Sequence, residues 1–168
     1  SISRSQGNVN LDSTDYMLLF NQVRLNNLDS AEVYAQLAIE QGELMGDSLL
    51  LLRAQSAKAW VLQEKGEYLD AVELYERGLN IALNNGYRSR VKFILNNLGS
   101  IHTDYANYSD ALKYHFESLK LREEDGNLGE IAVASNNIGL VYYQISDYEQ
   151  AIFYFQQALT IMEDTDLS

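Results

Sequence analysis

Residues 138–158 read IGLVYYQISDYEQAIFYFQQA, and residues 98–118 read LGSIHTDYANYSDALKYHFES. The two stretches start 40 residues apart and share a Gly at the second place, a Tyr at the eleventh and an Ala at the fourteenth. Two sets of small residues keep the same spacing along the chain: Ala31, Ala71, Ala111 and Ala151, and Gly46, Gly86 and Gly126. So many matched offsets indicate an internal repeat with a period of 40 residues.

Each repeat predicts a pair of helices. The first helices are expected at about 12–28, 48–65, 88–105 and 128–145. The second helices are expected to begin at the residue before each repeated Ala, where a side-chain oxygen can accept hydrogen bonds from free backbone amides. These starting residues are Ser30, Asp70, Asp110 and Gln150. The glycines at 46, 86 and 126 then end the second helices in the left-handed conformation. Small residues at two places per unit indicate that the two helix backbones cross closely.

One such helix pair cannot bury its own apolar face, whereas stacked neighbours can. We therefore predict an all-α fold, a right-handed superhelical solenoid of four helix-turn-helix units. The array is expected over residues 12–168, with repeats at about 12–51, 52–91, 92–131 and 132–168. Residues 1–11 are polar and aperiodic, so they are predicted to be a leader or linker.

The pattern resembles the tetratricopeptide repeat across residues 12–168. The third and fourth units match it best, at Leu98-Gly99 and at 138–142, followed by Tyr148, Ala151, Phe155 and Ala158. The family's closing Pro is absent, and its usual period of about 34 residues is exceeded, which predicts longer helices. This longer variety looks like the arrays of bacterial sensor histidine kinases and regulator proteins, of animal cell-polarity adaptors and of kinesin light chains. The resemblance implies a non-enzymatic module for signal transduction that binds a peptide or protein.

The resemblance also implies that the first helices line a concave groove, with five groove places in each unit. Three units place there Arg53, Ser56, Ala57, Trp60 and Gln63; Phe93, Asn96, Asn97, Ser100 and Thr103; and Val133, Asn136, Asn137, Leu140 and Tyr143. Chaperone-binding relatives clamp a carboxylate with Lys or Arg at the second and fourth of these places. Neither place is cationic here, so a clamp of that kind is disfavoured.

The side chains Asn97 and Asn137 are the foremost candidates for peptide contact. Asn96 and Asn136 precede them, so the two pairs are expected on neighbouring first helices. An Asn amide both donates and accepts, and a row of them can hold the backbone of an extended peptide. The alternative is that they bond to neighbouring helices or to water. Trp60 either anchors a ligand or packs against the next helix pair, and a lone groove Arg is more often a solvated ion pair.

Composition and charge exclude several classes of function. Lys plus Arg is 12 and Asp plus Glu is 24, a net charge of −12, so nucleic acid is not an expected partner. The longest apolar run, residues 49–52, is too short for membrane insertion. The chain has no Cys, and His102 and His115 fit core places of the repeat. No catalytic, cofactor or metal site is expected. The compartment stays open between cytoplasmic and, for a bacterial sensor module, periplasmic.

The last second helix is apolar on its outer side and is followed by 163–168 without a polar capping helix. We expect either that the chain is excised from a longer protein or that this face meets another copy, as a possible homodimer. Phe153 and Met162 represent this predicted self-association face. The alternative function is therefore a structural oligomerisation element that dimerises through the last hairpin.

Overall fold

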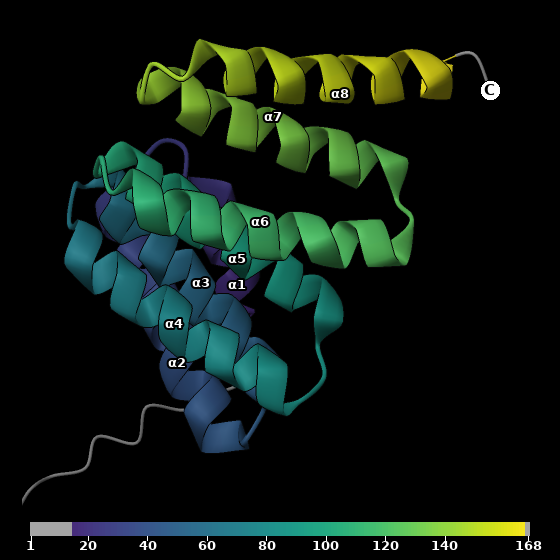
Figure 1. Ribbon diagram of the computed structural model, residues 1–168. Coiled ribbons are helices and arrows are strands. Elements are labelled where there is room, and N and C mark those ends of the chain that lie inside the picture. Colours follow the sequence, from purple (N-terminus) through teal and green to yellow (C-terminus); the bar gives the residue numbers. More distant parts are fainter. Residues whose placement is uncertain (1–14, 167–168) are drawn as a thin grey trace, which may run out of the picture.

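The computed structural model describes residues 15–166 and the side chains of residues 15–163. These residues form α1 (Tyr16–Val23), α2 (Leu28–Met45), α3 (Ser48–Glu64), α4 (Tyr68–Asn84), α5 (Arg88–Asp104), α6 (Tyr108–Asp125), α7 (Leu128–Gln144) and α8 (Tyr148–Asp166). Each helix packs mainly on the helices before and after it in the chain. The four hairpins stack into a right-handed solenoid that runs from α1–α2 to α7–α8 (Figure 1), which confirms the predicted fold class. The predicted leader lies outside the described residues.

The second helix of each pair begins two residues earlier than predicted, at Leu28 in the first pair and at a Tyr in the other three. The N-cap of α2 is Asn27, whose side-chain oxygen accepts a hydrogen bond of 2.9 Å from the Ser30 amide. The predicted start at Ser30 was wrong because polar and acidic residues also favour the first helical turn, where negative charge meets the positive end of the helix dipole. Asp70 and Asp110 lie in such first turns.

The hairpins also meet earlier in the chain than the predicted repeat limits. The loops around Gly46, Gly86 and Gly126 separate them, whereas limits after residues 51, 91 and 131 fall inside α3, α5 and α7. The helix α1 likewise ends at Val23, before the predicted residue 28, because the amides of Asn26 and Asn27 bond back to the Val23 carbonyl. The repeated small residues fix the period of the array but not its phase.

Left-handed residues end the helices, as predicted for the glycines between hairpins. Gly46 caps α2 with φ 66° and Gly126 caps α6 with φ 69°. A second left-handed residue lies inside each of the last three hairpins, 40 residues apart: Gly66, Ala106 and Ser146. The last two have φ 57° and 64°, a conformation that costs residues with a Cβ about 1–2 kcal/mol.

The close crossing of the two helices in each hairpin is confirmed at Gly99 and Gly139. An added Cβ on Gly99 would lie 2.5 Å from the ring of His115, and one on Gly139 would lie 2.7 Å from Phe155. His115, which was predicted to occupy a core position of the repeat, thus packs its ring directly on the backbone of a neighbouring helix. Burial, and then the charge of Arg122, lowers the pKa of His115 to about 4.

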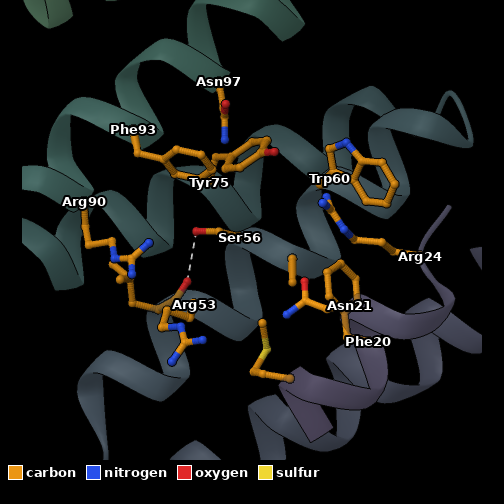
Figure 2. A pocket seen from close by; sticks show the side chains of 13 residues that line it. Phe20, Asn21, Arg24, Arg53, Ser56, Trp60, Tyr75, Arg90, Phe93 and Asn97 are labelled. Carbon is orange, nitrogen blue, oxygen red and sulfur yellow. Dashed lines mark hydrogen bonds between the residues drawn. The ribbon is translucent and has the colours of Figure 1, made fainter. Parts of the chain in front are cut away.

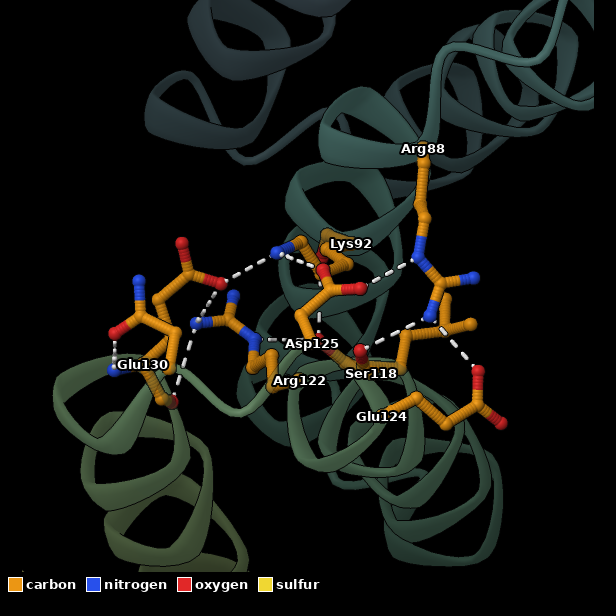
Figure 3. Close-up of polar contacts among 9 residues, drawn as sticks. Arg88, Lys92, Ser118, Arg122, Glu124, Asp125 and Glu130 are labelled. Carbon is orange, nitrogen blue, oxygen red and sulfur yellow. Dashed lines mark hydrogen bonds and ion pairs between the residues drawn. The ribbon is translucent and has the colours of Figure 1, made fainter.

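A cluster of charges, which the sequence did not reveal, joins α5, α6 and the start of α7 (Figure 3). Lys92 Nζ lies 2.6 Å from a carboxylate oxygen of Asp125 and 2.8 Å from one of Glu130. Arg88 binds the same Asp125 at 2.7 Å and Glu124 at 2.8 Å. Hydrogen bonds from Lys92 and Arg88, in that order, lower the pKa of Asp125. The acidic end of α6 is thus paired with cations of α5.

Candidate binding groove

The first helices converge on one hollow of about 410 Å³ on the concave side of the stack (Figure 2). Its lining comes from α1, α3 and α5, with one residue from α4. The lining residues are Met17, Phe20, Asn21, Arg24, Leu52, Arg53, Ser56, Ala57, Trp60, Tyr75, Arg90, Phe93 and Asn97. The 40-residue period explains the convergence, because equivalent places of successive first helices come side by side. We call this hollow the groove pocket.

The walls of the groove pocket are aromatic. Trp60 packs edge-on against Phe20 of the preceding hairpin, with ring centroids 6.2 Å apart, whereas the predicted alternative was packing against the next helix pair. Tyr75 is fully buried beneath the pocket, and burial raises the pKa of its phenol. Phe93 is 48% exposed, so its ring is free to pack against a ligand.

Three arginines line the same pocket. The guanidinium of Arg24 lies 5.6 Å from the centre of the Trp60 ring, a cation–π distance. Arg53 reaches the pocket from α3 and Arg90 from the first turn of α5, and Figure 2 shows these two side by side. Arg53 was predicted to be the only cation of the groove and to be ion-paired. The structure adds two more, and none of the three forms an ion pair with another described residue.

The predicted row of Asn residues is divided between two roles. The side chain of Asn137 on α7 donates to the Asn96 side chain on α5 at 2.8 Å, so these two join neighbouring hairpins. Asn97 lines the groove pocket, as does Tyr75. Asn136 is exposed and lines a separate hollow beside α8. Asn97 is therefore the one of the four that the pocket brings together with the arginines.

The remaining predicted groove residues lie at different depths. The Ser56 hydroxyl is buried and donates to the Leu52 carbonyl at 2.9 Å, and the Thr103 hydroxyl donates to the Gly99 carbonyl at 2.8 Å. Both hydroxyls are thereby used within their own helices. The others lie along α5 and α7 outside the groove pocket: Ser100 half-buried, and Leu140 and Tyr143 exposed.

The two residues of the predicted self-association face do not share one surface. Phe153 and Met162 are both exposed on α8, at 58% and 56%. Nine residues of an α-helix turn through about 180°, so the two side chains leave opposite sides of α8. Met162 lines a hollow of about 450 Å³ with Val133 of α7, whereas Phe153 lines another with Ile152.

Reasoning from sequence missed Arg24, Arg90 and Tyr75. A signal for each cation was present: Arg90 precedes Phe93 by one helical turn, and Arg24 follows Met17 and Phe20 at helical spacing on one face. Within residues 15–166, no helix is long and apolar enough to cross a membrane. The same part of the chain has no group of three His, Cys, Asp or Glu that could hold a metal ion.

Known proteins share this architecture. The tetratricopeptide repeat family matches residues 93–164. No curated protein matches the chain. Many solved structures do, among them BtubC (BKLC) from P. vanneervenii, with 25% sequence identity, a TM-score of 0.79, and coverage of 89% of this chain and 61% of that chain.

Two further structures have the same fold at lower identity. One is a signal transduction ATPase with numerous domains from Pyrococcus horikoshii, which has a tetratricopeptide repeat sensor. It is 24% identical, with a TM-score of 0.79 and coverage of 87% of this chain and 23% of that chain. The other is a Rap protein complexed with Competence and Sporulation Factor, 20% identical, with a TM-score of 0.76 and coverage of 90% and 43%.

This chain spans less than two thirds of the length of each of the three proteins. The agreement of the hairpin stack with these structures extends over most of the chain, well beyond the segment that the family matches. Residues 93–164 are thus tetratricopeptide repeats, and Tyr16–Asp166 as a whole has the fold of a tetratricopeptide repeat array, a protein-interaction fold.

Proposed function

We propose that this chain is a non-enzymatic module that holds a peptide or an extended partner segment in its concave groove. The observation that carries the proposal is the groove pocket, where half-exposed Phe93, Arg53 and Asn97 come from two neighbouring first helices. Aromatic and Arg side chains dominate binding energy in protein interfaces. The pocket offers both kinds, together with an amide that can bond a peptide backbone.

The proposed context is a larger signalling or regulatory protein, similar to the sensor histidine kinases that carry such arrays. Two observations support it: one structural neighbour has a tetratricopeptide repeat sensor, and another is complexed with Competence and Sporulation Factor. We propose binding to protein rather than to nucleic acid, since the chain carries a net charge of −12.

The test is affinity capture from the native cell, with two matched variants. Phe93→Ala removes a pocket ring that is 48% exposed, and Leu69→Ala removes an α4 side chain that is 74% exposed and lies outside the pocket. We expect a protein that the wild type and Leu69→Ala both retain and that Phe93→Ala loses. Identical capture by all three proteins would refute the groove as the working surface. Circular dichroism should show all three to be equally helical.

A second candidate function is an oligomerisation element built on α8. Its support is the apolar exposure of this helix, at which Ile152, Phe153, Leu159 and Met162 are each 55–58% exposed. Because Phe153 and Met162 leave opposite sides of α8, Phe153→Glu and Met162→Glu separate the two possible contact faces. Multi-angle light scattering should then show a dimer that one of these variants dissociates. A strict monomer at high wild-type concentration would exclude this candidate.

A further inference from the structure

The three arginines of the groove pocket have no acidic partner in the described part of the chain, a property they share with Lys58, Lys113 and Lys120. In the described part of the chain, carboxylates lie within 4 Å of five cations: Lys65, Arg77, Arg88, Lys92 and Arg122. Arg24, Arg53 and Arg90 form no such pair with a described residue, although the chain has 24 acidic residues. No acidic side chain lines the groove pocket itself, although Glu130 shares a neighbouring hollow with Arg90 and Phe93.

The charged side chains of the pocket lining are all cationic. Figure 2 draws 13 lining side chains, and none of them is acidic. Figure 2 shows Arg53 and Arg90 at the same end of the pocket, where no acidic side chain lines it. Two cations on one wall favour an anionic ligand. At the other end, Arg24 lies over the indole of Trp60.

Between the two cationic ends the pocket carries apolar and amide side chains. Phe93, which is 48% exposed, lies on the Arg53–Arg90 side with its ring next to that of buried Tyr75. The amides of Asn21 and Asn97 also face the pocket and can bond a peptide backbone. The hollow thus presents positive charge, an apolar ring and positive charge in succession.

From this order, and resting on the proposed function, we infer that the groove pocket binds an acidic peptide segment. Asp or Glu carboxylates of the segment meet the Arg53–Arg90 pair and Arg24, and an apolar side chain between them packs on Phe93. Guanidinium groups bind carboxylates through two parallel hydrogen bonds, which favours Arg over Lys at these places.

The net charge of −12 does not oppose such binding at physiological ionic strength. Charges farther than about 8 Å are largely screened there. The charged side chains that line the pocket itself are the three arginines, so a segment bound there meets positive charge first.

The experiment is selection of a random 12-residue peptide library, displayed on phage, against the whole chain. We expect the selected peptides to be enriched at least about threefold in Asp and Glu over the starting library. The best peptide, synthesised with an amidated C-terminus, should lose at least about tenfold in affinity for Arg53→Glu/Arg90→Glu, because the reversal replaces attraction with like-charge repulsion across the interface. Arg53→Gln/Arg90→Gln removes the two charges without reversing them and should also weaken binding. This milder change keeps the test valid if the charge-reversal variant misfolds.

The matched control is Lys113→Glu/Lys120→Glu, which changes the net charge by the same amount at two exposed residues of α6. It should leave the affinity within about twofold, because a screened remote charge contributes little. An equal loss of affinity in both double variants would overturn the inference, because the overall charge of the protein would then explain the loss. Neutral or basic selected peptides that Phe93→Ala no longer binds would also overturn it while leaving the proposed function standing. A selection without any enriched peptide would count against both.

Discussion

The contrast between Gly42→Ala and Gly78→Ala tests how the hairpins pack. Both glycines are buried in second helices, Gly42 in α2 and Gly78 in α4. A Cβ on Gly42 would lie 2.8 Å from the backbone nitrogen of Leu51 and 3.0 Å from its Cα. A Cβ on Gly78 would meet only ordinary contacts, the nearest being 3.4 Å to the Cδ1 of Ile94.

The expected changes in unfolding free energy have opposite signs. Ala is favoured over Gly inside a helix by about 1 kcal/mol. At Gly78 nothing opposes this gain, so we expect a stabilisation of about 0.5–1 kcal/mol. At Gly42 the neighbouring atoms are backbone and cannot rotate away, and overpacking of this kind costs about 1–3 kcal/mol. After the propensity gain is subtracted, the net result at Gly42 should be a loss of up to about 2 kcal/mol.

The assay is thermal unfolding followed by circular dichroism at 222 nm on the wild type and both variants. A change of 1 kcal/mol shifts the Tm of a domain this size by roughly 2–4 °C. We expect a lower Tm for Gly42→Ala and a higher Tm for Gly78→Ala. Equal stabilisation of both variants would refute the close approach of α2 to α3.

Three further predictions concern single buried or strained side chains. Because the pKa of His115 is lowered in the folded protein, the unfolded chain binds this proton more readily. The free energy of unfolding should therefore fall by up to about 3 kcal/mol between pH 6.5 and pH 4, as measured by urea titrations. The His115→Phe variant should show a weaker dependence of stability on pH. The Ser135 hydroxyl is buried without a partner among the described residues, so Ser135→Ala should stabilise by about 1 kcal/mol, whereas Ser118→Ala, which removes a bond to the Lys92 carbonyl, should destabilise by a similar amount. At the left-handed turn, Ala106→Gly should raise the free energy of unfolding by about 1 kcal/mol and Gly66→Ala should lower it by about 1 kcal/mol. Thermal unfolding should therefore show a higher Tm for the first variant and a lower Tm for the second, and Tm changes of equal sign would contradict the strain argument.

The fold could be predicted because its determinants are local and repeated. Small residues 40 apart mark where helix backbones cross, and Gly99 and Gly139 lie at such crossings in the structure. The phase of the helices could not be predicted as well, since polar residues serve both as caps and in first turns. Asn27, rather than Ser30, caps α2 for this reason.

The groove could be predicted only in part. The family resemblance placed Arg53, Phe93 and Asn97 in one groove, and all three line the groove pocket. Arg90 was missed because it lies one turn before the first groove place of its unit, and Arg24 because the first repeat departs from the family pattern. Both depend on how neighbouring hairpins rotate against each other.

The ion-pair cluster at Lys92 was missed for a related reason. Asp125 lies at the end of one helix and Glu130 at the start of the next, and only the stacked fold brings both to the same ammonium group. A run of acidic residues in a sequence does not reveal the cation that it meets across a hairpin junction.

The central claim, that the concave groove is the working surface, is tested most directly by photocrosslinking in the native cell. A photoreactive phenylalanine analogue would replace Phe93 in the groove pocket or, as the control, Leu69 on α4, both of which are exposed. The account predicts a discrete crosslinked partner from position 93 and none from position 69. The same partner from position 69, with nothing captured at position 93, would contradict it.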